Sequence, residues 1–299
     1  GEWPTLENQT PNYKKEELAL LKEKFEDKVA EKIQRFAFKH AEAETDKATF
    51  QAMEALIHNL NTMHSRAGAQ IPFSSLNYGT DTSPEGRLVM KNLLYATERG
   101  LGNGETPIFP IQIFKVKEGV NYNPEDKNYD LYKLSMRVSA KRLFPNFSFI
   151  DAPYNLQYYK PGHPETEVAY MGCRTRVMGN VYDPDREITY GRGNLSFTSI
   201  NLPRLAILSN KNIDFFFEQL DRMCDLVVGQ LLERFEIQCQ KLVRNYPFLM
   251  GQGIWLDSDK LTPNDSVRDV LKHGSLTIGF IGLAECLVVL TGKHHGESE

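Results

Sequence analysis

The sequence predicts an α/β fold, and two observations favour it. Segments whose apolar residues recur at helical spacing, such as residues 14–48 and 213–242, alternate along the chain with short apolar runs typical of strands, such as residues 108–116. The chain of 299 residues has the length of one large domain or two ordinary ones, and 41% of its residues are hydrophobic and 25% charged, close to the soluble average. A disordered, collagen-like or low-complexity chain is therefore excluded.

The N-terminal region is expected to form an arm followed by two helices. Residues 1–13 are polar, contain Pro4 and Pro11, and are predicted to be an arm. Residues 14–48 are predicted to form one long helix and residues 49–64 a second. The long helix carries an apolar stripe at steps of three or four, made of Leu18, Leu21, Phe25, Val29, Ile33 and Phe36.

A row of lysines lies on another face of the long predicted helix. Lys24, Lys28 and Lys32 repeat every four residues. Such a row is either a solvated face or a docking face for an anion or a partner helix, and the pattern leaves both interpretations open.

The central segments alternate between loops, strands and a helix. Residues 66–88 are small, polar and punctuated by glycine and proline, which predicts a loop-rich segment with a strand entry. Three glycines at 100, 102 and 104 precede the strand at 108–116 and lack the dinucleotide-binding spacing, so that fingerprint is not met. A helix over 129–143, a strand over 147–150 and an irregular stretch over 151–167 are predicted to follow.

The C-terminal part is predicted to contain two further helices. Residues 213–242 are strongly periodic and follow Asn212, a residue type that caps helix N-termini. Their apolar face consists of Phe216, Leu220, Met223, Val227, Leu231 and Phe235. The last helix is predicted to begin near Thr277.

Charge and cysteine usage limit the classes of function. The net charge of −4 gives no basic bias, so nothing favours nucleic-acid binding. The cysteines at 173, 224, 239 and 286 are too scattered for a disulfide scaffold or a zinc site, and a reducing cytosol is their simplest setting. No apolar run is long enough to span a bilayer and there is no secretory signal. We therefore expect a cytoplasmic protein with no metal site in this chain.

Two segments are unusual in their polar content. Residues 171–177 place Cys173 after a glycine at a loop-to-strand transition, and residues 191–204 combine many Asn, Ser and Thr residues with apolar ones that require burial. A buried polar strand is unfavourable unless its groups are hydrogen-bonded. Either a ligand or an internal hydrogen-bond network would satisfy these groups, and the sequence does not decide between them.

Six motifs, taken in order, resemble the anaerobic (class III) ribonucleoside-triphosphate reductases of the glycyl-radical enzyme family. They are residues 59–66 (NLNTMHSR), 70–81 (QIPFSSLNYGTD), 171–174 (MGCR), 191–194 (GRGN), 201–204 (NLPR) and 273–285 (HGSLTIGFIGLAE). The resemblance runs from about residue 50 to the end of the sequence. It implies a ten-stranded α/β barrel with a central finger loop, of which residues 14–299 would form part.

The same resemblance assigns two catalytic residues. Cys173 matches the finger-loop cysteine, whose thiyl radical abstracts the ribose 3′ hydrogen, and Asn194 matches an asparagine that hydrogen-bonds the ribose hydroxyls. Hydrogen-atom abstraction needs a neutral thiol at rest, so neighbouring cations are unfavourable. In an extended segment Arg174 points away from Cys173, and Arg176 could reach a triphosphate or a buried carboxylate.

Other residues follow from the resemblance, each with a structural alternative. Ser74, Ser75 and Asn77 would lie on a barrel strand near the substrate or form a structural polar network. His64 and Arg66 would face the nucleotide, although an interior histidine with satisfied hydrogen bonds is equally compatible.

Two glycines and two lysines complete the expected binding residues. Gly279 and Gly282 would open the last helix as a phosphate site, or would allow close packing. Lys28 and Lys32 would contact deoxynucleotide effectors in a dimer or effector element over residues 14–48. Cys286 is expected in a helix core, with a reductant-facing thiol as the alternative.

Parts of the family pattern have no counterpart in this sequence. An N-terminal ATP-cone, a four-cysteine zinc site and an Arg-x-x-Gly-Tyr glycyl-radical loop are not found. We therefore expect a central fragment that by itself binds no cofactor and is inactive, with the glycyl radical and zinc in a missing C-terminal part. A non-catalytic nucleotide-binding or dimerising module is the alternative.

The resemblance also implies partners. These are ribonucleoside triphosphates as substrates, dNTP or ATP effectors, a radical-SAM activating enzyme, a second copy in a homodimer, and formate or a thiol as reductant. Neither a membrane nor a nucleic acid is expected.

Overall fold

A computed structural model describes residues 6–64, 70–172 and 175–297 of the chain. The chain divides into two units, residues 1–148 and residues 149–299, and each is described by itself. Both units contain helices and strands, so the described part of the chain is mixed α/β, as the sequence predicts. Among the described residues, no helix combines the length and apolarity needed to cross a bilayer.

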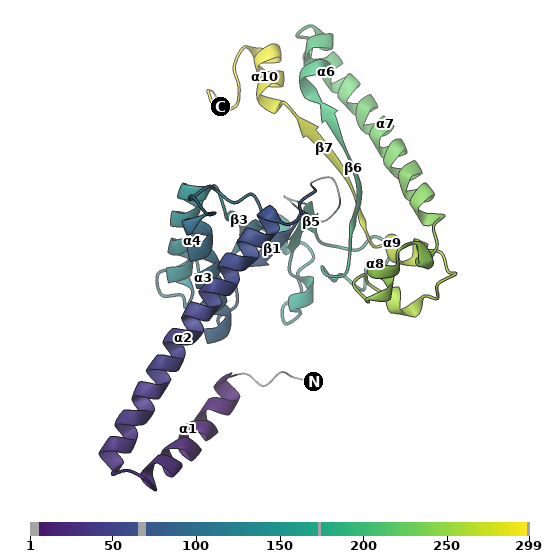
Figure 1. The fold of residues 1–299 in the computed structure, drawn as a ribbon. Coiled ribbons are helices and arrows are strands. Elements are labelled where there is room, and N and C mark those ends of the chain that lie inside the picture. Colours follow the sequence, from purple (N-terminus) through teal and green to yellow (C-terminus); the bar gives the residue numbers. More distant parts are fainter. Residues whose placement is uncertain (1–5, 65–69, 173–174, 298–299) are drawn as a thin grey trace. The chain divides into compact units, whose positions relative to one another are not determined.

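The first unit combines helices with a three-stranded sheet (Figure 1). The sheet has the strand order β1-β2-β3, and β1 pairs with β2 in parallel, with Ser75 opposite Ile111 and Tyr78 opposite Phe114. The elements in chain order are α1 (Leu6–Lys22), α2 (Asp27–Thr62), β1 (Ser75–Tyr78), α3 (Pro84–Arg99), β2 (Ile111–Val116), α4 (Tyr129–Arg142) and β3 (Asn146–Phe149).

Strand β2 is the centre of this sheet and is nearly all buried. Its side chain Phe114 packs with Met90 of α3 and Leu131 of α4 in one apolar cluster. Tyr78 of β1 packs against the same cluster, and burial raises the pKa of its hydroxyl well above the usual range. That hydroxyl donates a hydrogen bond to Gln112 Oε1 at 2.7 Å, so the buried polar group is satisfied.

Helix α3 lies where the sequence analysis expected the end of a loop-rich segment and no helix. Its N-cap is Ser83, whose side chain accepts a hydrogen bond from the Gly86 backbone N–H at 3.0 Å, and Pro84 occupies the first helical turn. Gly100 follows its last residue. The helix therefore carries an ordinary start signal at Ser83 and Pro84 and a stop signal at Gly100, and both could have been read from the sequence.

The N-terminal helices differ from the expectation of an arm and one helix over 14–48. Helix α1 already spans part of the expected arm, the chain turns at residues 23–26, and α2 continues through the region expected to be a separate helix. The turn lets α1 pack against α2, where the Gln34 amide donates to the Lys14 carbonyl at 2.7 Å and Lys14 lies over the Phe38 ring. This tertiary pairing overrides an uninterrupted helical period, and no glycine or proline marks the turn.

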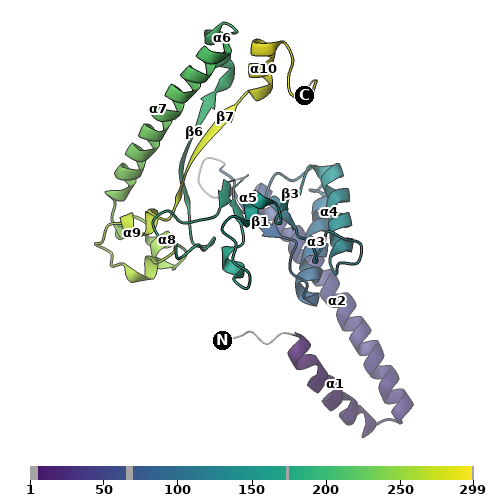
Figure 2. The same cartoon turned by 180° about the vertical axis from the view of Figure 1, so that it is seen from behind.

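The second unit is built around two long parallel strands (Figures 1 and 2). Its longer elements are β4 (Ala169–Met171), β5 (Thr175–Val177), β6 (Asn194–Asn201), α6 (Leu202–Ser209), α7 (Ile213–Cys239), β7 (Ser275–Ile281) and α10 (Leu283–Thr291). Its short helices are α5 (Pro153–Leu156), α8 (Pro247–Gly251) and α9 (Arg268–Leu271), with 3₁₀ turns η1 (Pro164–Thr166), η2 (Val243–Asn245) and η3 (Ser258–Lys260).

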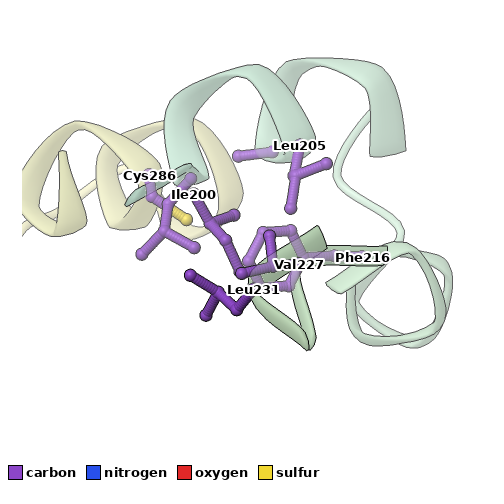
Figure 3. Close-up of a cluster of buried hydrophobic side chains, with 8 residues drawn as sticks. Ile200, Leu205, Phe216, Val227, Leu231 and Cys286 are labelled. Carbon is purple, nitrogen blue, oxygen red and sulfur yellow. The ribbon is translucent and has the colours of Figure 1, made fainter. Parts of the chain in front are cut away.

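Helix α7 provides the crossover that a parallel pair of strands requires. It runs alongside β6 and β7, with α6 and α10 at one end of the strands and α8 and α9 at the other (Figures 1 and 2). Its predicted apolar face is confirmed, because Phe216, Val227 and Leu231 are buried in one core cluster together with Ile200 and Cys286 (Figure 3). The predicted cap is confirmed too, since Asn212 Oδ1 accepts from the Phe215 backbone N–H at 3.0 Å.

The predicted start of the last helix near Thr277 is wrong. Residues 275–281 form strand β7, which pairs with β6 from Asn194 opposite Ser275 to Asn201 opposite Ile281. Apolar side chains at every second position, 276, 278 and 280, fit a strand better than a helix. The helix begins only at Leu283, because pairing with β6 fixes the preceding residues in extended conformation.

Candidate functional site

A hairpin leads into and out of the cysteine predicted to be catalytic. Strands β4 and β5 are antiparallel, with Met171 opposite Thr175. Gly172 has φ 56°, a left-handed conformation that favours glycine. Cys173 and Arg174 lie outside the described residues, so the structure places the two strands that flank them and not their side chains.

Asn194 is the first residue of β6, and its side-chain amide is exposed. Its Nδ2 donates to Thr175 Oγ1 at 3.4 Å, and its Oδ1 accepts from Thr277 Oγ1 at 3.4 Å. Both distances are at the long end for hydrogen bonds, so these contacts hold the amide weakly. The structure therefore brings Asn194 to the strand that follows Cys173, with one donor and one acceptor able to exchange partners.

Thr175 and Thr277 were not identified as site residues from the sequence. Thr175 stands two positions after Cys173, which in an extended strand is the same face, so strand periodicity could have indicated it. Thr277 was assigned to a helix, and its place beside Asn194 follows only from the pairing of β6 with β7.

Three other polar groups of β6, those of Ser196, Thr198 and Asn201, have partners within the protein. Thr198 donates to Gln230 Oε1 at 3.0 Å, and Ser196 Oγ accepts from Arg234 at 3.1 Å, both partners being on α7. Asn201 caps α6 by accepting from the Arg204 backbone N–H at 3.1 Å. An internal network thus accounts for these three groups, and the role of Asn194 in ligand binding stays a prediction.

One expectation for β6 is wrong. Phe197 was expected to be buried, and its side chain is 66% exposed. Successive strand residues point to opposite faces, and the buried residue of this strand is Ile200, which joins the core cluster under α7.

Arg192 ties the start of β6 to neighbouring segments. Its Nε donates to the His273 carbonyl at 2.6 Å, and its Nη1 donates to the Gly179 carbonyl and, at 3.3 Å, to the Ile188 carbonyl. Burial lowers the pKa of the Arg192 guanidinium from its ordinary value. Because the guanidinium donates to three backbone carbonyls, Arg192 supports the backbone at the start of β6, two residues before Asn194.

A cluster of charged side chains surrounds Asp257, next to His273 at the start of β7. Asp257 accepts two hydrogen bonds from Arg186, at 2.7 and 2.9 Å, and forms an ion pair with Lys260 at 2.8 Å. These cations hold the pKa of Asp257 well below its usual range. His273 has its Nε2 4.0 Å from the same carboxylate, and burial lowers the pKa of the imidazole.

A cavity of about 310 Å³ adjoins Asn194. Its walls include Trp255, Tyr246 and Leu271, so the lining is mainly apolar. The volume is at the lower end of the range for small-molecule sites.

Arg176, considered as a ligand for a triphosphate or a buried carboxylate, has other partners. Its guanidinium donates to Asn155 Oδ1 at 3.2 Å and lies over the Tyr154 ring at 5.1 Å. Strand alternation places it on the opposite face from Thr175. The interpretation as an anion ligand is therefore replaced by a contact with the short helix α5.

Ser74, Ser75 and Asn77 lie in the first unit, at the start of and within β1. Leu76 and Tyr78 of this strand pack with apolar clusters of the helices, so Ser75 and Asn77 point to the other face of the sheet. Both are half-buried. The Ser74 hydroxyl donates to the Pro72 carbonyl at a long 3.4 Å. Their role in substrate binding stays a prediction.

His64 and Arg66 were predicted to face the nucleotide. His64 follows the C-cap Met63 of α2 and is exposed, so the alternative of a satisfied interior histidine does not hold. Arg66 lies outside the described residues.

Gly282 opens the last helix as predicted, whereas the prediction that Gly279 does so is wrong; a phosphate-binding role of Gly282 stays a prediction. Gly279 is inside β7, where a Cβ would lie 3.1 Å from Ser199 Oγ. Gly282 is the N-cap of α10 with φ 77°, and a Cβ there would lie 2.4 Å from Pro203 Cγ. Both glycines therefore lie at close contacts, as the packing alternative expects.

Lys28 and Lys32 are exposed in the first turns of α2, whereas Lys24 is in the turn before it. The lysine row is thus shorter than expected, and an effector contact stays a prediction.

The three cysteines on helices pack against apolar side chains, and the prediction that Cys286 lies in a helix core is confirmed. Cys286 is buried in the core cluster under α7, and burial raises the pKa of its thiol (Figure 3). Cys239 is buried and Cys224 is half-buried. Within the described ranges, no group of three or more His, Cys, Asp or Glu side chains is arranged to hold a metal ion.

The sequence is similar to one family of known proteins. The family model described as anaerobic ribonucleoside-triphosphate reductase matches residues 21–299. The anaerobic ribonucleoside-triphosphate reductase of Haemophilus influenzae is 32% identical over 259 residues, which cover 86% of this chain and 35% of the relative. The enzyme of the same name from Enterobacteria phage T4 is 32% identical over 267 residues, covering 87% of this chain and 43% of the relative.

A solved structure is also similar. The anaerobic ribonucleotide reductase from Thermotoga maritima with citrate in the active site has a TM-score of 0.51 and 16% identity, covering 82% of this chain and 41% of that chain. This likeness shows the fold alone. The chain spans 35% and 43% of the lengths of the two curated relatives.

Proposed function

The chain belongs to the anaerobic ribonucleoside-triphosphate reductase family, and from this premise we propose that it carries the hydrogen-abstracting part of such a reductase. The substrates would be ribonucleoside triphosphates, reduced to deoxyribonucleoside triphosphates. The catalytic residues would be Cys173 and Asn194.

The observation that carries this proposal is the position of the Asn194 amide. It lies between Thr175, two residues after Cys173, and Thr277 of the neighbouring strand. An amide offers one donor group and one acceptor, which matches a pair of adjacent ribose hydroxyls. A ribose that replaces the weak threonine contacts would thus lie beside the segment that carries Cys173.

The proposed reaction is the one that the family implies. A glycyl radical would supply the oxidising equivalent that converts the Cys173 thiol to a thiyl radical. The Cys173 sulfur would form an S–H bond as the C3′–H bond of the ribose breaks, and it would return that hydrogen to C3′ at the end. Asn194 would orient the 2′ and 3′ hydroxyls, the 2′ oxygen would take up a proton and leave as water, and formate or a thiol would supply the two electrons and the hydrogen that C2′ gains. The protein provides orientation and exclusion of side reactions.

The orientation of Arg176 supports the proposal of a neutral thiol at rest. The guanidinium of Arg176 is directed to Asn155 and Tyr154 and not to the face of Thr175. A neighbouring cation would favour a thiolate, which cannot donate a hydrogen atom.

Further binding roles complete the proposal. Ser74, Ser75 and Asn77 would bind substrate from the other face of their sheet, with His64 and Arg66 near the nucleotide. Lys28 and Lys32 would contact a dNTP or ATP effector in a homodimer. A radical-SAM enzyme would activate the complete protein in the cytoplasm, where zinc and the glycyl radical would belong to other parts of the chain.

The test uses the complete natural protein, activated anaerobically with its radical-SAM partner. We expect Cys173→Ala to abolish formation of deoxyribonucleotide while leaving nucleotide binding intact. Cys224→Ala is the matched control, because its half-buried thiol lies on α7 and packs against the core cluster of that helix, and it should keep activity.

Asn194 is tested in the same assay. Asn194→Ala should lower kcat by about 10²-fold, because an interaction with the reacting hydroxyls is lost. Full activity of Cys173→Ala would overturn the proposal. Nucleotide binding without any turnover of the activated wild-type protein would favour the non-catalytic binding module.

A further inference from the structure

A buried amide and a buried imidazole face each other beneath the candidate site. Asn180 and His273 are 5% and 4% exposed, and Asn180 Nδ2 lies 3.0 Å from His273 Nδ1. Asn180 follows strand β5 by three residues, and His273 precedes strand β7 by two. The pair therefore connects the exit of the hairpin to the start of the strand that holds Thr277.

The orientation of the Asn180 amide is fixed by the backbone. Its Oδ1 accepts hydrogen bonds from the backbone N–H groups of Tyr182 and Asp183, both at 3.2 Å. Exchanging the oxygen and the nitrogen would place an NH₂ group against two N–H donors. The amide therefore presents its NH₂ group to His273 Nδ1 at 3.0 Å, closer than the 3.4 Å between Oδ1 and the same ring nitrogen.

This orientation determines the tautomer of His273. A nitrogen that faces an N–H donor must accept, so Nδ1 carries no proton and the ring proton is on Nε2. The Nε2 side lies 4.0 Å from the Asp257 carboxylate, which is itself held by Arg186. A second proton on Nδ1 would set two donors against each other.

Charged groups of both signs surround the imidazole. Asp257 and Asp183 favour the imidazolium, whereas Lys272 and Arg186 disfavour it, and burial is the largest effect and lowers the pKa of His273. Asp257 precedes the 3₁₀ turn η3, Asp183 and Arg186 come from the loop after β5, and Lys272 is the residue before the histidine. The neutral ring is thus favoured by both packing and hydrogen bonding.

The backbone of the same histidine is bound to β6. Arg192 donates to the His273 carbonyl at 2.6 Å and to the Gly179 carbonyl, which precedes Asn180. One guanidinium and one amide–imidazole pair therefore hold together the hairpin exit and the starts of β6 and β7.

We propose that Asn180 holds His273 with its single ring proton on Nε2, and that this pair acts with Arg192 as a positioning device for Asn194. The device fixes the starts of β6 and β7 at the separation in which the Asn194 amide reaches Thr175 and Thr277. Its catalytic consequence rests on the proposed function, whereas the tautomer is a property of the fold.

The first test measures the tautomer directly. In protein labelled with ¹⁵N-histidine, the His273 signals are assigned by their loss in His273→Gln. We expect the Nδ1 shift of an unprotonated nitrogen at neutral pH in the wild-type protein. A protonated Nδ1 in the wild-type protein would by itself overturn the proposal.

The second test changes the amide to a carboxylate. Asn180→Asp keeps an acceptor for the two backbone N–H groups and presents an oxygen to Nδ1, which favours the imidazolium. The pKa of His273 should rise by about 1 unit or more relative to the wild-type protein. Asn155→Asp is the matched control, because Asn155 is equally buried in the same unit and bonds the Phe149 carbonyl and Arg176 instead.

An unchanged pKa of His273 in Asn180→Asp would contradict the proposal. In the complete activated reductase, Asn180→Asp should have a lower kcat than the wild type at pH values below the raised pKa of His273, with little change in KM. Its kcat should recover at higher pH. A wild-type protein without reductase activity would refute the proposed function and leave the tautomer result standing.

Discussion

Asp257 links several charged side chains of the second unit, and its pKa makes stability depend on pH. The carboxyl group is 19% exposed and is held by Arg186 and Lys260, which lower its pKa from the ordinary 3.8. A lowered pKa in the folded protein means that the contribution to stability is full above the unfolded pKa, about pH 4, and is lost as the pH falls further.

We therefore predict a pH-dependent effect of Asp257→Asn. At pH 7 the substitution should lower the free energy of unfolding by about 1–2 kcal/mol, because charge-assisted hydrogen bonds are lost at a partly exposed site. The difference from wild type should shrink below about pH 4, where the carboxylate of the unfolded protein is already protonated. Urea titrations at about pH 7 and about pH 3 measure it, and a difference that is equal at both pH values would contradict the assignment.

Gly282 is a residue whose conformation and packing both require glycine. Its φ is 77°, and a Cβ at this position would lie only 2.4 Å from Pro203 Cγ, which leaves no room for a side chain. Gly282→Ala should lower the free energy of unfolding by about 1–3 kcal/mol.

Gly229 in the middle of α7 is the matched control for that substitution. A Cβ at Gly229 would meet no heavy atom within 4 Å, so Gly229→Ala should raise the free energy of unfolding by about 0.5–1 kcal/mol. Chemical denaturation of both variants measures these changes in the free energy of unfolding. Equal effects of the two substitutions would contradict the strain and the close contact expected at Gly282.

At the level of elements, helix α7 does more than bury an apolar face. Arg234 donates to Ser196 Oγ and to the Phe197 carbonyl, and Gln238 donates to the Leu195 carbonyl at 3.3 Å. These two helix residues are one turn apart, and they cover carbonyl groups of β6. Side chains of a helix thus occupy positions at which another strand could bind.

Arg234→Ala should uncover these carbonyl groups. We expect a loss of about 0.5–1.5 kcal/mol in the free energy of unfolding and faster aggregation on mild heating. Arg222→Ala, at an exposed position of the same helix, is the control and should change neither quantity. Unchanged aggregation of Arg234→Ala would show that the edge is protected by other means.

The helical character of the N-terminal region and the reversal of its chain have different origins. The helical character of residues 14–62 follows from the spacing of apolar residues, and α1 and α2 confirm it. The reversal at residues 23–26 does not, because it has no glycine or proline and depends on the packing of Gln34 and Phe38 against Lys14. Local propensity predicts a helix, and only tertiary contact shows where it is interrupted.

At the scale of the whole molecule, large apolar side chains remain exposed on the central strands of the second unit. Phe197, Ile278, Phe280 and Ile281 are 66%, 42%, 60% and 58% exposed. Parallel strands are normally buried on both faces. Exposed apolar surface of this kind favours association.

We expect this chain by itself to self-associate for that reason. Light scattering coupled to gel filtration should give a mass above 34.2 kDa that increases with concentration. A monodisperse monomer over the same range of concentration would contradict the expectation.

The sequence by itself determined the family, the α/β class, the periodic helix α7 with its cap, and the choice of Cys173 and Asn194 as candidate site residues. These follow from residue order, because motifs, caps and apolar periods are local. The strand β7, the roles of Gly279 and Gly282, and the contacts of Asn194 with Thr175 and Thr277 were decided by tertiary structure. Each depends on the register between β6 and β7 or on the contact of β5 with β6, and such pairing joins residues 19 to 83 positions apart, which no local pattern specifies.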